Sequence, residues 1–140
     1  MMYKVLLVIC VAVMGCQQDK GSIAGKVTKA GVGQKNAIVL AITGDSLTSG
    51  QNINPDNLKG TIVLSNDGSY KILLVDAGNY VVAAINDKNS NHTFEDSVDE
   101  IGYFGHKDTL TNLTIPDKVT LEKGENKTGV NIDTLYVLPH

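Results

Sequence analysis

The sequence predicts an all-β fold, an antiparallel β-sandwich of about seven strands, from three features. Short runs of apolar or alternating residues recur along the chain, as they do in strands. Turns rich in glycine, asparagine and aspartate separate these runs. After residue 16, the three-and-four apolar spacing of an amphipathic helix is missing from the sequence. The length of 140 residues favours one domain.

The first two predicted strands differ in character. In segment 21–29, polar and apolar residues alternate, so Ile23 and Val27 share one face. Segment 37–42 is apolar throughout, which predicts a strand buried on both faces. The polar segment 43–59 follows, and we expect it to be a long loop or an excursion at a sheet edge.

The next two strands are expected at 60–65 and 69–75, on either side of a turn. The residues between them are Asn-Asp-Gly, which tolerate the positive φ that a hairpin turn requires. We therefore expect a hairpin at this point. Leu73, in the second of these strands, is expected to be buried.

The strand expected at 79–86 carries an uncharged apolar run between a glycine and an Asn-Asp pair. Such a run suits a strand that is buried on both faces, with Val82 in the core. Shorter strands are expected at 111–115 and 118–122. A last strand is expected at 128–137, where apolar residues alternate with polar ones.

Three short motifs occur in a fixed order along these strands. The first is Gly-x-Ile-x-Gly-x-Val at 21–27, the second is Asn-Asp-Gly-Ser-Tyr at 66–70, and the third is Ala-Gly-Asn-Tyr-Val-Val at 77–82. Together they resemble the carboxypeptidase regulatory-like domains, which are Ig-like, prealbumin-like (transthyretin-like) sandwiches of exported bacterial proteins. The resemblance implies that Tyr70 and Tyr80 fill the core from neighbouring strands. The family name reflects occurrence beside peptidases and implies no catalysis.

The first fifteen residues predict a signal peptide. Lys4 gives a weakly positive start, and the apolar run 5–14 is too short to span a bilayer, which takes about twenty residues. The sequence Val-Met-Gly-Cys at 13–16, where this run ends, resembles the lipobox of bacterial lipoproteins, in which the cysteine is lipidated and becomes N-terminal after cleavage. We expect lipidation of Cys16. An ordinary signal peptide with an incidental cysteine is the alternative.

This interpretation divides the chain into a signal peptide at 1–15, a lipidated cysteine with a short tether at 16–20, and a β-sandwich domain at 21–140. The protein would be exported and lipid-anchored to the bacterial cell envelope, at the outer membrane in a Gram-negative cell. The other cysteine, Cys10, would be removed, so the core alone would hold the fold. The net charge of −3 argues against nucleic acid and against electrostatic docking on anionic lipid. The expected partners are the membrane, through the anchor, and envelope proteins or glycans.

Residues 87–100, called here the acidic loop, are the first candidate site. Asp and Asn alternate at its start, as in the first half of a calcium loop of the EF-hand or dockerin kind, and Ca²⁺ takes six to eight oxygen ligands. The candidate metal ligands are Asp87, Asn89, Asn91, Asp96 and Asp99. Two departures matter, because His92 stands where such a loop has glycine and Val98 where it has an acid. The alternative is a solvated loop with Asx turns.

The adjacent aromatic residues Tyr103 and Phe104 are the candidate ligand-binding pair. Exposed aromatic rings can form a platform for sugars, and the alternative is that the pair caps the core. The sequence has neither a Gly-x-Ser-x-Gly motif nor the arginines on which the transthyretin-like hydrolases depend. We therefore expect a non-catalytic structural or binding domain, stabilised by Ca²⁺ if the acidic loop binds it. The competing function is an accessory or carbohydrate-binding module of a surface glycan- or peptide-processing system.

Overall fold

The computed structural model describes residues 19–44, 47–56 and 58–139, and this part of the chain is all-β. The predicted signal peptide and Cys16 lie outside the described residues. Twelve strands are described, more than the seven or so expected. They are β1 (Gly21–Lys26), β2 (Thr28–Lys29), β3 (Val32–Gly33), β4 (Ile38–Ile42), β5 (Gly60–Ile62), β6 (Ser69–Val75), β7 (Gly78–Asn86), β8 (Glu100–Tyr103), β9 (Gly105–Lys107), β10 (Thr114–Pro116), β11 (Val119–Leu121) and β12 (Asn126–Lys127). Within the described ranges, no helix is long and apolar enough to cross a membrane.

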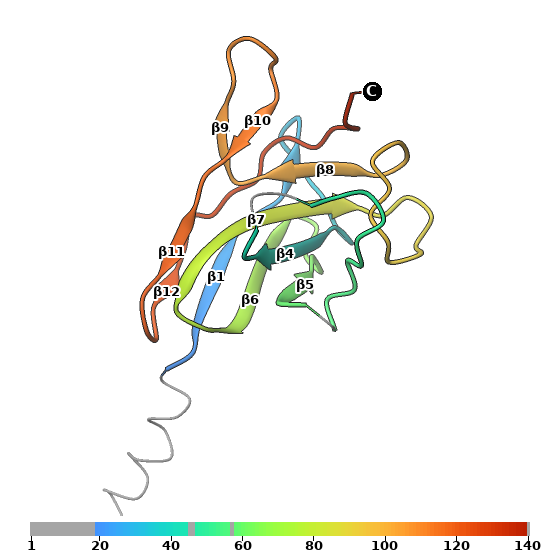
Figure 1. Ribbon diagram of the computed structural model, residues 1–140. Helices are drawn as coiled ribbons and strands as arrows, with labels where there is room; N and C mark the ends of the chain where they lie inside the picture. The colour runs from blue at the N-terminus through green and yellow to red at the C-terminus, as the bar shows by residue number, and fades with distance from the viewer. Residues whose placement is uncertain (1–18, 45–46, 57, 140) are drawn as a thin grey trace, which may run out of the picture.

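The strands form two main sheets that face each other (Figure 1). One has three strands in the order β12-β1-β6. In the other, β7 lies between β4 on one side and both β11 and β8 on the other, and β5 pairs with the far edge of β4. Two small ladders, β2–β3 and β9–β10, extend from this sandwich. The predicted antiparallel sandwich is therefore confirmed, with one parallel pair, β1–β12.

The central strands β4 and β7 are buried on both faces, as their apolar runs predict. Along β7, alternate side chains enter two different clusters, because successive residues of a strand point to opposite faces. Tyr80, Val82 and Ala84 join the inner core, which lies between the two sheets. Val81, Ala83 and Ile85 join the outer core, on the other face of the same sheet. Tyr70 is also buried in the inner core, as expected.

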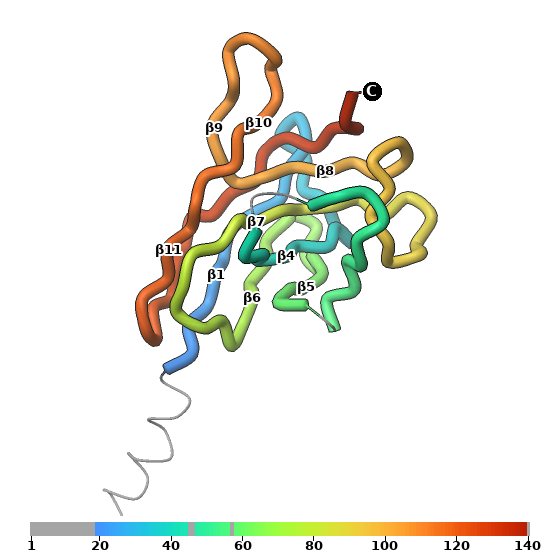
Figure 2. Tube along the Cα trace, in the orientation of Figure 1, coloured from blue at the N-terminus to red at the C-terminus, as the bar shows by residue number. Residues whose placement is uncertain are grey.

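Two loops cover the outer core in place of a third sheet. The covering loop, residues 43–59, inserts Leu47 and Ile53, and the acidic loop inserts Phe94. The two loops are joined by backbone hydrogen bonds, including Ile53 N–H to the His92 carbonyl at 3.0 Å. Figure 2 shows them side by side on the right of the molecule. The described residues of segment 43–59 thus form a loop, one of the two predicted alternatives, and serve as a layer of the fold.

The expected strand at 128–137 is wrong. The strand β12 ends at Lys127, before this segment, and Gly129, with a φ of 72°, then turns the chain out of the extended region. The chain nevertheless continues along β1, because Val130 N–H donates to the Ala24 carbonyl at 3.0 Å. Gly25 permits this approach, since a Cβ there would lie 1.9 Å from the Val130 carbonyl oxygen. The C-terminal segment therefore completes the edge of β1 without forming a long strand.

The turn at 66–68 forms as predicted, but it does not close a hairpin within one sheet. Gly68 has a φ of 87°, and its N–H donates to the Ser65 carbonyl at 3.1 Å. However, β5 and β6 belong to different sheets, so the turn carries the chain across the sandwich. Apolar periodicity alone does not distinguish these two connections.

The expectation that Leu73 is buried is also wrong, because Leu73 alternates with the inward-facing Tyr70 and Ile72, and a bulge in β6 then turns Leu74 outward as well. Gly21 pairs with Val75 and Ile23 with Ile72, so two leucines, Leu73 and Leu74, lie opposite one residue of β1. Both point outward, with 61% and 58% of their surface exposed. Leu74 has a φ of 57°, which an ordinary L-residue rarely adopts. We call this pair the leucine bulge.

The two faces of β6 predict opposite results for the neighbours Ile72 and Leu73. Replacing Ile72, which is 1% exposed, by alanine is expected to lower the free energy of unfolding by about 2–4 kcal/mol, because it leaves a cavity in the inner core. Replacing Leu73 by alanine should change it by less than about 0.5 kcal/mol. Urea unfolding of the two variants measures both values. Equal losses would contradict the outward position of Leu73.

Candidate functional site

The acidic loop connects β7 to β8 and begins and ends at paired residues. Asn86, the last residue of β7, pairs with Glu100, which is both the last residue of the loop and the first of β8. Inside the loop, Phe94 is fully buried and fixes the loop against the outer core. The strands and this aromatic anchor therefore hold the loop in a defined conformation.

Asp99 organises the backbone of the acidic loop from within. Its carboxylate is buried, with no exposed surface, and accepts two backbone N–H groups, from Lys88 to Oδ1 and from Glu95 to Oδ2, both at 2.9 Å. The two donors lie on opposite limbs of the loop, so one side chain connects them. Asp99 was predicted as a metal ligand, but both of its oxygens are engaged in these hydrogen bonds. In the described structure it acts as an internal backbone acceptor.

Three further side-chain oxygens of the loop also accept hydrogen bonds within it. Asp87 Oδ2 accepts the His92 N–H at 2.9 Å, and Asn91 Oδ1 accepts the Thr93 N–H at 3.1 Å. Glu95 Oε1 accepts the side-chain amides of Asn89, at 2.7 Å, and of Asn91. These two hydrogen bonds hold the pKa of Glu95 below its ordinary value. The predicted Asx turns are thus present in the loop.

One oxygen of the loop differs from these. Asp87 Oδ1 is buried and has no hydrogen-bond partner among the described residues. A buried carboxylate oxygen without a donor is unfavourable, since folding removes its water without replacing it. It is the atom of the loop at which a cation or a water molecule would be stabilising.

The structure gathers the predicted metal ligands only in part. Asp87, Asn89 and Asn91 lie together in the first half of the loop with Glu95, which was not in the predicted set. Asp96 lies at the border with the covering loop, where its N–H faces Ser49 Oγ at 3.5 Å. Across the described ranges, no three His, Cys, Asp or Glu side chains are arranged to hold a metal ion.

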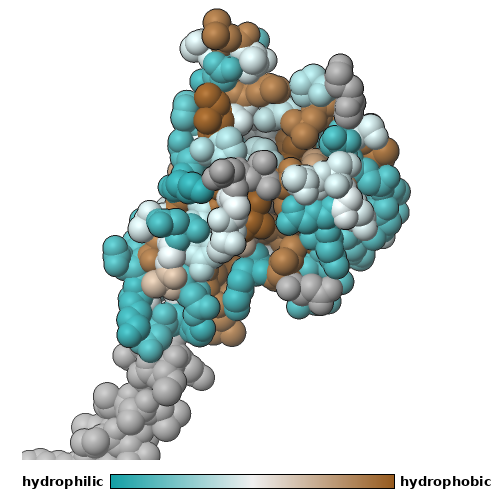
Figure 3. All heavy atoms as spheres, in the orientation of Figure 1, coloured by the Kyte–Doolittle hydropathy of each residue, from teal (hydrophilic) through white to brown (hydrophobic). Residues whose placement is uncertain are grey.

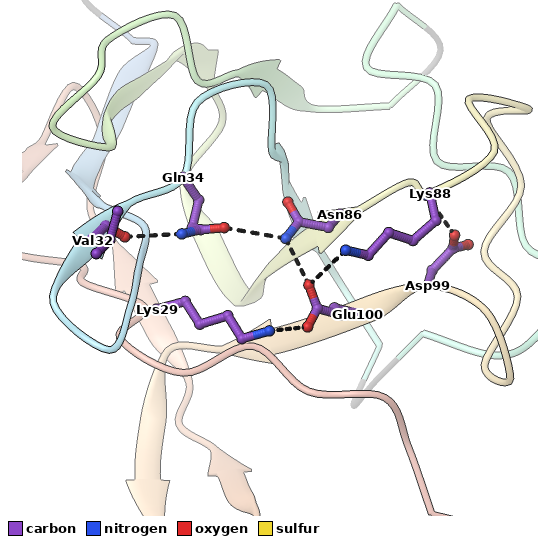
Figure 4. A network of polar contacts seen from close by, with 7 residues as sticks. All are labelled: Lys29, Val32, Gln34, Asn86, Lys88, Asp99 and Glu100. Carbon is purple, nitrogen blue, oxygen red and sulfur yellow. Dashed lines mark hydrogen bonds and ion pairs between the residues drawn. The ribbon is translucent and has the colours of Figure 1, made fainter.

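A second polar cluster lies at the base of the loop, and sequence reasoning missed it (Figure 4). Glu100 pairs with Lys29, and with Lys88 at 3.2 Å, and it accepts the Asn86 amide at 2.9 Å. Burial would raise the pKa of Glu100, but the hydrogen bonds from Lys29, Asn86 and Lys88 outweigh it and lower the pKa to about 2. Lys29 belongs to β2, so this cluster ties the β2–β3 ladder to the acidic loop. Lys29 and Glu100 are 71 residues apart, and no local signal marks the pair.

The candidate aromatic pair lies in the cores. Tyr103 is buried in the outer core, and its hydroxyl accepts the Leu47 N–H at 3.2 Å. Burial raises the pKa of this phenol. Phe104 is partly buried against the inner core. The two rings thus lie on opposite faces of the sheet, which corresponds to the core-capping alternative.

Comparisons with known protein families, with curated proteins and with solved structures found no match. The geometry of the site therefore carries the functional argument.

The role of Asp99 can be tested by stability. Replacing Asp99 by alanine is expected to lower the free energy of unfolding by about 2–4 kcal/mol, because it leaves two N–H groups inside the loop without an acceptor. The matched control is Asp56→Ala, an exposed aspartate of the covering loop, which should change it by less than about 0.5 kcal/mol. Equal values for the two variants in urea unfolding would contradict this role.

Proposed function

We propose that this protein is a lipid-anchored, non-catalytic domain of the bacterial cell envelope that holds the acidic loop away from the membrane for binding. The observation that carries the proposal is the direction of β7. The strand begins at Gly78, three residues after Val75, which pairs with Gly21 at the start of β1. It ends at Asn86, where the acidic loop begins.

The length of β7 sets how far the loop lies from the anchored end. Nine residues of strand span about 25–30 Å, at roughly 3.3 Å per residue. The β9–β10 ladder also lies far from the start of β1, at the top of the molecule in Figure 1. An anchor at Cys16 would therefore leave both features facing away from the bilayer. A rigid loop that presents carboxylates and amides suits recognition of a polar partner or a cation.

Calcium is the cation that the loop would take. The residues fit it in part, because Asp87 Oδ1 is a buried oxygen that lacks a donor, while both oxygens of Asp99 already have donors. Asp87 would hold the ion with the amide oxygen of Asn89, while Asn91 Oδ1, which accepts the Thr93 N–H, and Asp99 would keep the loop backbone in place. The ion would neutralise the carboxylates and fix the loop. Because so few of its ligands are acidic, affinity should be weak, near the range of about 0.1–1 mM known for extracellular sites.

The anchor is tested by changing Cys16 to serine. The variant cannot be lipidated, so we expect either a soluble form or an uncleaved form, and no mature-sized protein in the detergent phase on phase partition. Mass spectrometry of the unchanged protein should find acyl chains on its N-terminal cysteine. A mature-sized Cys16→Ser protein that still enters the detergent phase would contradict the anchor.

Calcium binding is tested by thermal unfolding. Calcium at about ten times its dissociation constant should stabilise the fold by about 1.4 kcal/mol and raise the Tm by a few degrees. Sodium at the same ionic strength should not. Asp87→Asn keeps an oxygen for the His92 N–H and removes the charge, so it should abolish the calcium effect, whereas Asp56→Asn should retain it. If Tm is the same in calcium and in sodium, the loop does not use this ion.

A further inference from the structure

The leucine bulge is an unusual feature of the outer surface. In a regular strand, Leu74 would follow Tyr70 and Ile72 into the inner core, because alternate residues share a face. Leu73 faces outward by the same alternation, and the bulge turns Leu74 outward beside it and lets Val75 take the inward position. This arrangement places Leu74 at a φ of 57°, a conformation that is unfavourable for leucine. Two apolar side chains are thus held in solvent at the expense of backbone strain.

The bulge lies beside the point where the chain enters the domain. The residue opposite the two leucines is Ser22, near the start of β1. Lys20, just before β1, forms an ion pair with Asp76, two residues after Leu74. This pair fixes the entering chain to the end of β6. Figure 3 shows hydrophobic spheres among hydrophilic ones at the lower end of the molecule, where β6 ends.

The chain before β1 limits how far this end can move from an anchor. Gly21 is five positions after Cys16, and even fully extended this stretch spans at most about 18 Å. If Cys16 carries the lipid, as the proposed function holds, the start of β1 stays near the headgroups. The leucine bulge is next to the start of β1. Lys20 and Asp76 neutralise each other beside the leucines, so this pair adds no net charge to the surface.

We propose that Leu73 and Leu74 form a second membrane contact, which inserts into the bilayer interface and fixes the orientation of the anchored domain. This inference rests on the lipid anchor of the proposed function. The acyl chains would hold the protein at the bilayer, and an additional apolar contact would limit how the domain turns about that anchor. The contact is apolar, so it does not depend on anionic lipid. A bulge also interrupts the flat ladder that a partner strand would need, which disfavours strand pairing at this edge.

The experiment uses the full lipidated protein, reconstituted into vesicles of phosphatidylethanolamine and phosphatidylglycerol. An environment-sensitive dye is attached at Lys71→Cys, an exposed position in β6 that leaves both leucines in place. The matched control carries the dye at Leu110→Cys, a residue 91% exposed and remote from β1 in the loop between β9 and β10. Quenching by lipids that carry a nitroxide near the headgroup measures the proximity of each dye to the interface.

We expect a blue-shifted emission and at least about twofold stronger quenching at position 71 than at position 110. The double change Leu73→Ser and Leu74→Ser should reduce quenching at 71 to the control value, while the protein still floats with the vesicles. Both serines replace exposed side chains, and circular dichroism checks that the variant remains folded. The same result in phosphatidylcholine vesicles is expected for an apolar contact.

The two proposals fail in different ways. If the unchanged protein does not float with vesicles, the anchor itself is absent and the proposed function is overturned. If it floats but the dye at position 71 is quenched no more than the dye at 110, only the leucine contact is overturned. Quenching at 71 that persists in the double serine variant also overturns the contact. If the blue shift of the dye at position 71 grows with the number of proteins per vesicle, the leucines contact another copy of the protein. That result also overturns the proposed membrane contact.

Discussion

Burial of β4 and β7 on both faces is the constraint on which the rest of this structure depends. A strand with apolar side chains on both sides needs two covering layers, and a sandwich of two sheets supplies one. The sheet of β12, β1 and β6 covers the inner face. The covering loop and the acidic loop cover the outer face with Leu47, Ile53 and Phe94. Both loops are therefore structural layers as well as surface segments.

A layer made of loops must satisfy its own backbone, because it lacks the regular ladder of a sheet. The Asp and Asn side chains of the acidic loop meet this need. Asp99 accepts two N–H groups from opposite limbs, and Asp87 and Asn91 each accept one. The side chains that resemble a calcium loop thus accept hydrogen bonds from the loop backbone. Among the described residues, Asp87 Oδ1 is a buried oxygen that has no hydrogen-bond partner.

The features that could be predicted from the sequence are those that local patterns determine. The apolar runs of β4 and β7 indicated burial on both faces, and Asn-Asp-Gly marked the turn before β6. The leucine bulge could not be predicted, because Leu73 and Leu74 continue an apolar run and only the pairing with β1 shows which of them fits the core. The ion pair of Lys29 and Glu100 could not be predicted either, since its members come from distant strands. At the candidate site, the residue types indicated which side chains offer oxygen atoms. They did not indicate that backbone N–H groups would donate to those oxygens.

The position of the C-terminal segment has a consequence for the order in which the chain can fold. Ser22 pairs with Asn126, 104 residues later, and the Val130 backbone closes over Gly25, so β1 acquires one of its two neighbours only from a distant segment. Contacts so distant in sequence form late, because a long loop of chain must close before they are made. During synthesis, one edge of β1 would therefore stay unpaired until residues 126–130 had been added.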